Sequence, residues 1–188
     1  MIILALGVAL WSAMHFLPSV APGIRDRIID AIGPKAYRGV FSIDMLIALA
    51  LMIWGYRSAE WIFVYEPPAW GWHANNALMI LAIYLFGVGG AKGWLATKVR
   101  HPMLLGALLW ATAHLLANGD QASVLLFGGM WLWAAGMIFM INRRVSVWVP
   151  PKHGGLKADV VLIVVTLIIY VVIAFTHWFL LGVKPFPG

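Results

Sequence analysis

Cysteine is absent from the 188-residue sequence, and charged residues are scarce. Without cysteine, the chain can form no disulfide, thiolate nucleophile, iron–sulfur cluster or cysteine-bound zinc site. Charged residues make up 11% of the chain, whereas a soluble domain carries about 25%. That is too few to cover a water-exposed surface, so the composition excludes an ordinary cytosolic enzyme and a disordered linker.

Apolar and aromatic residues fill most of the chain. Hydrophobic residues make up 63% of it, with eleven tryptophans, and the net charge is +6. A bilayer core of about 30 Å needs about 20 mostly apolar residues per helical crossing. The sequence therefore predicts an all-α bundle, a single transmembrane domain over residues 1–188 with no nucleic-acid partner. The six predicted spans are Ile2–Leu17, Val40–Tyr56, Ala74–Gly90, Pro102–Ala117, Ala122–Ile141 and Val160–Leu181.

Basic residues predict the orientation of these spans. Eleven of the thirteen Lys and Arg residues fall in the first, third and fifth loops between the spans. Because basic loops stay in the cytoplasm, we expect both chain ends outside. In the first loop, the segment Ala21–Tyr37 carries Ile24, Ile28 and Ile32 at a spacing of four. This spacing predicts a short amphipathic helix on the inner membrane face.

Two histidines lie inside predicted spans, where an ionisable group is costly unless it is paired or used. His15 is near the inner end of the first span, and His114 is within the fourth. Each is either a neutral imidazole hydrogen-bonded between helices or a metal ligand. Two imidazoles cannot complete a zinc site, which takes three or four protein ligands. They can complete a haem site, because the porphyrin supplies the other four nitrogens.

The other four histidines lie at predicted membrane interfaces. We expect His73 and His153 to be solvated and His177 to be an aromatic-flanked interface anchor. His101 sits at the inner mouth of the fourth span.

Depth in the bilayer leaves the histidine pairing open. His114 lies about 18 Å along its helix from Pro102, at about 1.5 Å per residue. His15 is near the inner face. The two imidazoles therefore lie at the same depth in the bilayer only if the helices tilt or the fourth span begins deeper. By depth alone, His15 would pair with His101, or His114 with His73.

The fourth span carries further candidates. Trp110 lies one turn before His114 on the same helix face. Arg100 either binds a propionate, a phosphate or a lipid headgroup, or anchors the positive side. Asp120 is expected to cap the fifth span. The small residues either make room for a flat ring or permit close helix packing; they are Gly106, Ala107, Ala111 and Ala113.

Several motifs together resemble the NnrU family of bacterial membrane proteins. They are His15 with Ala21–Asp26, Tyr65–Gly71, and Arg100-His101-Pro102 through Asp120 and on to Gly129. The resemblance covers the chain up to about Arg144. It implies a bacterial inner-membrane protein associated with denitrification, that is, with nitrite and nitric oxide reduction.

The same residues are similar to a more distant family, the plant and cyanobacterial zeta-carotene isomerases. That resemblance implies haem b held by two histidines, matching His15 and His114. The isomerases carry a cysteine linked to ligand switching three positions before the second histidine, where this chain has Ala111. Arg100-His101-Pro102 followed by Gly106 also resembles the cofactor motif of membrane methyltransferases that use S-adenosylmethionine.

The leading hypothesis is therefore a haem-b membrane protein of nitrogen-oxide metabolism, with His15 and His114 as axial ligands. Arg100 and His101 would contact the propionates or the ligands, and Trp110 would line the ring. A first alternative is a membrane enzyme acting on a lipophilic small molecule, either an isomerase or a methyltransferase. A second is a cofactor-free accessory protein of a respiratory or denitrification complex.

Overall fold

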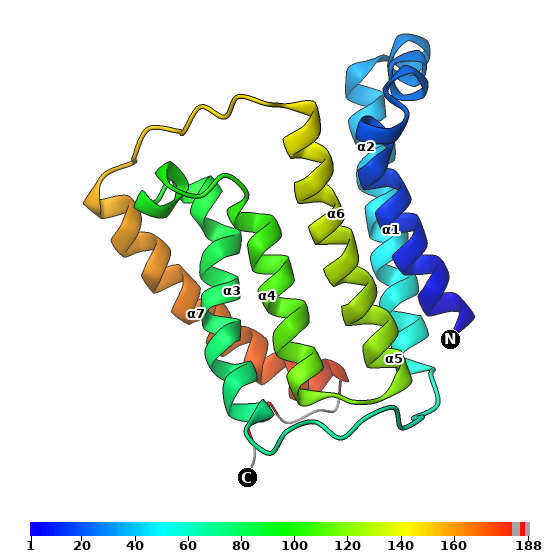
Figure 1. The fold of residues 1–188 in the computed structure, drawn as a ribbon, viewed down its shortest axis with the longest axis vertical. Helices are drawn as coiled ribbons and strands as arrows, with labels where there is room; N and C mark the ends of the chain where they lie inside the picture. The colour runs from blue at the N-terminus through cyan, green and yellow to red at the C-terminus, as the bar shows by residue number, and fades with distance from the viewer. Residues whose placement is uncertain (182–184, 187–188) are drawn as a thin grey trace. The chain divides into compact units, whose positions relative to one another are not determined.

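The computed structural model describes residues 1–181 and 185–186, and most of them are helical (Figure 1). Helix makes up 79% of the structure, and no β-strand occurs in the described part. This confirms the all-α prediction. The elements are α1 (Ile2–Val20), α2 (Pro22–Arg57), α3 (Gly71–Ala91), the 3-10 helix η1 (Trp94–Thr97), α4 (Pro102–Ala117), α5 (Gln121–Ser123), the π-helix η2 (Val124–Gly128), α6 (Gly129–Arg144) and α7 (Leu156–Leu181).

The six predicted spans all fall within these helices. Five helical segments of the described chain are long and apolar enough to cross a membrane: Ile2–Val20, Pro34–Arg57, Gly71–Ala91, Gln121–Arg144 and Leu156–His177. The sixth, α4, is apolar but shorter, with 16 residues. The number of crossings and the orientation of the chain ends stay predictions.

Proline and glycine determine several helix boundaries. Pro102 stands in the first turn of α4, and Pro22 in that of α2, where the missing N–H costs nothing. Gly33 adopts φ 83° and ψ 157° inside α2. Glycine tolerates this conformation, and with Pro34 it separates the predicted amphipathic segment from the apolar part of the helix.

The chain divides into two compact units, Met1–Val64 with Asp120–Arg144 (unit 1), and Tyr65–Gly119 with Val145–Gly188 (unit 2). Each unit is a group of packed helices. The prediction of one transmembrane domain over the whole chain stays a prediction.

Unit 1 packs α1 between α2 and α6. A Cβ on Gly7 would lie 2.8 Å from the Met52 backbone nitrogen, and one on Gly55 would collide with the backbone of Leu4. These contacts show that α1 and α2 run antiparallel with their backbones close together. On the other side, α6 runs parallel to α1, because its early Gly129 meets Val8 and its later Gly136 meets Phe16.

A buried polar network joins α2 to the start of α5. The Asp120 carboxylate accepts hydrogen bonds from the backbone N–H and the hydroxyl of Ser123. The Tyr56 hydroxyl donates to Ser123 Oγ at 2.9 Å. Asp120 and Ser123 are both buried. The prediction that Asp120 caps the fifth span is confirmed.

Unit 2 packs α4 and α7 against α3. The buried face of α4 consists of glycine and alanine: Gly106, Ala107, Ala111, Ala113 and Ala117. A Cβ on Gly106 would lie 3.0 Å from the Ala82 carbonyl oxygen of α3. The small residues of α4 are therefore used for close packing with α3, the second of the two predicted uses. Leu162 of α7 packs with Leu85 and Val88 of α3 on another side.

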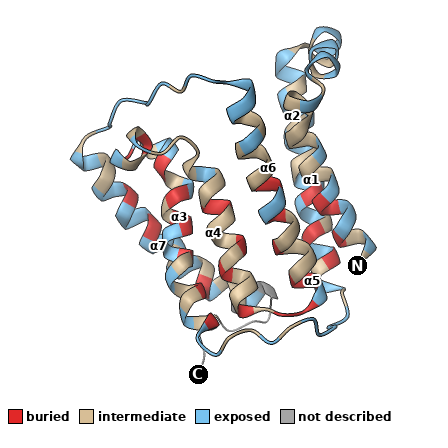
Figure 2. Ribbon diagram, in the orientation of Figure 1, coloured by how far each residue is buried: buried red, intermediate tan, exposed pale blue. Residues whose placement is uncertain are grey.

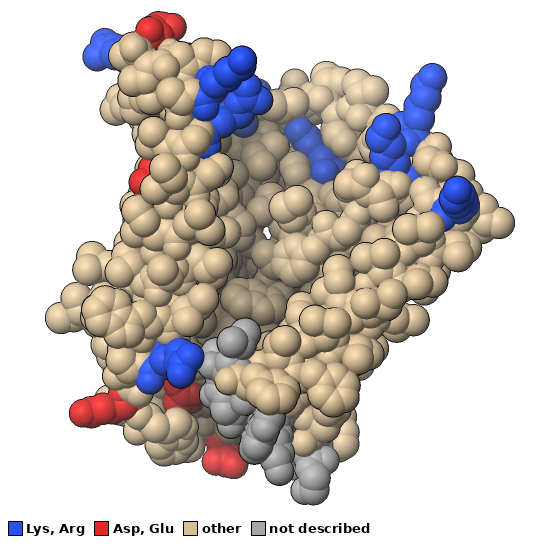
Figure 3. All heavy atoms as spheres, turned by 180° about the vertical axis from the view of Figure 1, so that it is seen from behind, with Lys and Arg blue, Asp and Glu red and all other residues tan. Residues whose placement is uncertain are grey.

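The exposed surface is that of a protein surrounded by lipid. Much of α7 is exposed (Figure 2), including Ile163, Leu167 and Ile168. Lys and Arg side chains gather mainly at one end of each unit's helices (Figure 3). This arrangement agrees with the basic loops of the sequence and with a membrane environment.

Candidate functional site

In unit 1, His15 is surrounded by aromatic rings. Its Nδ1–H donates to the Trp11 carbonyl oxygen at 2.8 Å, one turn earlier in α1. The imidazole centroid lies 4.7 Å from the Trp11 ring, 4.9 Å from Trp133 of α6 and 5.3 Å from Phe41 of α2. Because Nδ1 is committed to the backbone, Nε2 is the nitrogen of His15 that could bind a metal.

Trp133 is a site residue that sequence reasoning missed. It is one of eleven tryptophans, and nothing in its local sequence distinguishes it. It is 8% exposed and contacts both Trp11 and His15 edge-on. Neither its buried indole N–H nor that of Trp11 has a hydrogen-bond partner in the described part of the chain.

In unit 2, His114 is held in the same way. Its Nδ1–H donates to the Trp110 carbonyl oxygen at 2.8 Å, and the two rings lie 5.3 Å apart. Both units therefore contain a Trp-x-x-x-His turn in which the Nδ1–H of the histidine is bonded to the tryptophan carbonyl oxygen. The repeated spacing is visible in the sequence and could have identified Trp11 alongside Trp110.

His177 of α7 lies near His114. The adjoining apolar cluster contains Ala113 of α4, and Trp110, Tyr170 and Ile173 pack against it. His177 donates its Nδ1–H to the Ile173 carbonyl oxygen at 2.8 Å. His177 is expected from its sequence position to be an interface anchor; in the structure Ile173, one turn earlier, packs against the cluster that contains Ala113 of α4.

Arg100 and His101 lie at the start of α4. The Arg100 guanidinium donates to the Val145 carbonyl oxygen within unit 2, and His101 is the residue just before Pro102. The roles predicted for them at propionates or ligands stay predictions. Ala111, at the position of the isomerase cysteine, is fully buried in α4 and offers no side-chain ligand.

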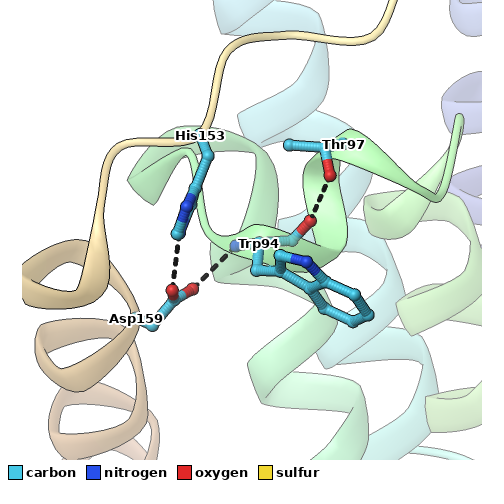
Figure 4. Close-up of polar contacts among 4 residues, drawn as sticks. All are labelled: Trp94, Thr97, His153 and Asp159. Atoms are coloured by element: carbon cyan, nitrogen blue, oxygen red, sulfur yellow. Dashed lines mark hydrogen bonds and ion pairs between the residues drawn. The ribbon is translucent and has the colours of Figure 1, made fainter.

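His73 and His153 match their predicted solvated positions. Both are exposed, and His153 lies in the loop before α7. Its Nε2 pairs with the Asp159 carboxylate at 2.6 Å, and the other carboxylate oxygen accepts the Trp94 backbone N–H at 2.7 Å (Figure 4). This contact fastens the loop to η1.

Two of the familiar sequence motifs meet in unit 2. The Tyr65 hydroxyl lies within hydrogen-bond distance of the carbonyl oxygens of Leu115 and Asn118 at the end of α4. Gly71 and Gly119 also approach backbone so closely that a Cβ on either would collide, with Leu116 and Tyr65 respectively. The Tyr65–Gly71 motif thus shapes the end of the helix that carries His114.

No group of three or more His, Asp or Glu side chains in the described residues could hold a metal ion. Two imidazoles remain a suitable set for a metal whose other ligands come from a porphyrin.

The long apolar helices indicate a helical membrane protein. The chain belongs to the NnrU family, because the family model "NnrU protein" matches residues 3–185, nearly the full length. The match extends through α7, beyond the motifs that carried the resemblance in the sequence. Searches against curated proteins and against solved structures find no match.

Proposed function

We propose that this chain is a bacterial inner-membrane protein that binds haem b, with His15 and His114 as axial ligands, and acts in denitrification. The bound haem would supply one-electron chemistry at iron. The proposal rests on the two Trp-x-x-x-His turns considered separately, since each turn is complete within its own unit.

The observation that carries this proposal is the hydrogen bond that both imidazoles donate from Nδ1 to a backbone carbonyl oxygen. Metal-binding histidines usually donate their second ring N–H to a carbonyl or carboxylate, which fixes the tautomer and the ring orientation. His15 and His114 both do so at 2.8 Å. The absence of cysteine leaves imidazole as the strongest ligand type available for iron.

The surroundings of His15 also fit a ligand. Trp11 and Trp133 bring two buried indole donors without acceptors in the described structure. A buried donor normally has a partner, so its absence supports a bound group that carries acceptor atoms. The role in denitrification is supported by NnrU family membership.

An absorbance spectrum tests the haem proposal. The full chain, purified in detergent from haem-replete cells, is expected to show a Soret band and a low-spin, six-coordinate spectrum. His15→Ala and His114→Ala should each give a high-spin spectrum, and the double variant should lose the band. A wild-type protein with no Soret band would refute haem binding.

His177→Ala is the matched control, because its Nδ1–H donates to the carbonyl one turn earlier in the same way. His73→Ala and His101→Ala test the two pairings that depth suggests. All three variants should keep the wild-type spectrum. Loss of the band in any of them, with an unchanged spectrum in either His15→Ala or His114→Ala, would reassign the ligand. Saturable S-adenosylmethionine binding that is lost in Arg100→Ala would favour the methyltransferase alternative.

A deletion strain tests the physiological role. Cells without this protein, respiring nitrate at low oxygen, should accumulate nitrite or nitric oxide, measured by colorimetry and with an electrode. The wild-type gene should restore turnover, and the double histidine variant should not. Unchanged nitrite and nitric oxide levels would contradict a role in denitrification.

A further inference from the structure

The first part of α2 is set apart from the rest of that helix. Gly33 adopts φ 83° and ψ 157°, and the long apolar part begins after it, at Pro34. The chain changes direction at this break, because residues 22–32 are seen nearly along their helix axis at one end of α2 (Figure 1). Residues 22–32, named the surface segment here, therefore form a short helix that runs across the apolar part of α2.

One face of the surface segment is apolar and is not covered by protein. At about 100° per residue, Ile24, Ile28 and Ile32 fall within a sector of about 80°. Ile24 is 54% exposed and Ile32 is 45% exposed. Contiguous exposed apolar side chains with a polar rim are typical of a surface that contacts a membrane or a partner.

The charged side chains of the segment are ordered around this face. Counted from Ile28 at its centre, Arg25 and Arg27 lie on opposite flanks, at about 60° and 100°. Asp26 and Asp30 lie on the far side, at about 160° and 200°. When such a helix lies on a bilayer, its arginines reach the headgroups at the edge of the apolar face, and its carboxylates point into water.

Further basic residues surround the segment. The Arg144 guanidinium donates to the Pro18 carbonyl oxygen at 2.9 Å, at the end of α1 that leads into the segment. Lys35 and Arg38 follow the break and are both exposed. Lys and Arg side chains gather at this end of the unit 1 helices (Figure 3). The two aspartates are thus outnumbered, and the region favours a negatively charged surface.

These features fit a bilayer that contains anionic phospholipid. We infer that the surface segment binds such lipids, with its isoleucines among the acyl chains and with Arg25 and Arg27 on the headgroup phosphates. Arg25 now pairs with Asp26 at 3.0 Å, and both side chains are exposed. An exposed pair contributes little, so this guanidinium can exchange the carboxylate for a phosphate. The inference goes beyond the proposed haem site and does not depend on it.

A spin label tests the position of each face. The chain has no cysteine, so one introduced cysteine carries a nitroxide at a single known position. Ile32→Cys and Asp30→Cys place the label on opposite faces of the segment. The full chain is reconstituted in nanodiscs of phosphatidylcholine, alone or with an equal part of phosphatidylglycerol. EPR power saturation then compares collisions with oxygen, which concentrates in lipid, and with a nickel chelate, which stays in water.

With phosphatidylglycerol present, the label at position 32 should collide mainly with oxygen and the label at position 30 mainly with nickel. Each basic residue contributes about fivefold to binding at an anionic surface. Arg25→Gln/Arg27→Gln should therefore lower the ratio of lipid-immersed to water-exposed label at position 32 by at least about tenfold. Omitting phosphatidylglycerol should lower this ratio in the wild-type background and have little further effect in the double variant.

Lys152→Gln/Lys157→Gln is the matched control, because it removes two exposed positive charges from unit 2 and should leave the ratio unchanged. Equal nickel access at positions 30 and 32 would overturn the inference. Immersion that depends on neither phosphatidylglycerol nor the two arginines would also overturn it, since apolar contact alone would then hold the segment. A label at position 32 that is shielded from both oxygen and nickel would indicate a protein partner in place of lipid.

Discussion

The two units hold one histidine each in the same local geometry, yet they differ in how completely their polar groups are satisfied. In unit 2, Tyr65 and Asn118 bond to carbonyl oxygens near the end of α4, and small residues close the α3–α4 contact. In unit 1, four buried donors have no acceptor in the described structure; they belong to Trp11, Ser19, Tyr37 and Trp133. In unit 2 the described residues leave one buried side-chain polar atom without a partner, Asn75 Oδ1, so unit 1 is the less completely satisfied of the two.

The largest expected effect is a loss of stability when alanine replaces a glycine at the closest backbone contacts. Such a substitution should destabilise either unit. Gly55→Ala in unit 1 and Gly71→Ala in unit 2 each force a Cβ into backbone atoms. Overpacking of this kind costs about 1–3 kcal/mol and sometimes more. Thermal unfolding in detergent, followed by circular dichroism, should show a clearly lower Tm for both. Gly39→Ala, with open space around it, should unfold like wild type.

The second-largest effect on stability concerns the buried hydrogen-bond network of Asp120, Ser123 and Tyr56 in unit 1. Asp120→Ala removes the acceptor for the Ser123 N–H and hydroxyl. The loss of a helix cap costs about 0.5–2 kcal/mol, and the buried serine loses its acceptor in addition. The same thermal measurement should show this loss, while the exposed Asp30→Ala should not. An unchanged Tm in Asp120→Ala would mean that water replaces the carboxylate.

A pair of tyrosine substitutions tests the comparison most directly. In ligand-free protein, Tyr65→Phe should cost about 0.5–1.5 kcal/mol, the usual net value of a hydrogen bond, because its hydroxyl is paired. Tyr37→Phe should cost nothing or stabilise, because its buried hydroxyl has no partner. Chemical denaturation of both variants without haem measures this. Equal destabilisation would show that the two units are alike.

The smallest effect concerns the loop before α7. His153 Nε2 pairs with the Asp159 carboxylate at 2.6 Å (Figure 4), and Asp159 also accepts the Trp94 backbone N–H of η1. His153→Ala removes the contact of the loop with Asp159, so a protease should cleave the loop at 145–155 faster in the variant than in the wild-type protein. Equal cleavage rates would show that this contact does not hold the loop.

Helix positions were largely predictable because apolar runs and proline define them. α4 has the predicted bounds Pro102–Ala117, since proline opens it and a turn sequence ends it. The amphipathic segment was predicted to reach Tyr37, but the break comes at Gly33. The reason is backbone conformation: a positive φ at glycine followed by proline interrupts the helix before the hydrophobic pattern changes.

Only part of the candidate site could be predicted from the sequence. The intramembrane cost of imidazole identified His15 and His114, and the spacing of four identified Trp110. Trp133 could not be found, because its contacts with Trp11 and His15 come from the packing of α6 against α1. A sequence pattern records which residues are present, but it does not reveal an unsatisfied donor.

In unit 1, the packing of α6 against α1 depends on the number of residues in the π-helix η2. A π-turn accommodates one residue more than an α-turn, and each residue rotates a helix by about 100°. Trp133 and Gly136 both follow η2, so the direction in which they face α1 depends on that extra residue. Deleting a single codon within Val124–Gly128 would swing the tryptophan away from His15 while leaving every residue around the histidine unaltered.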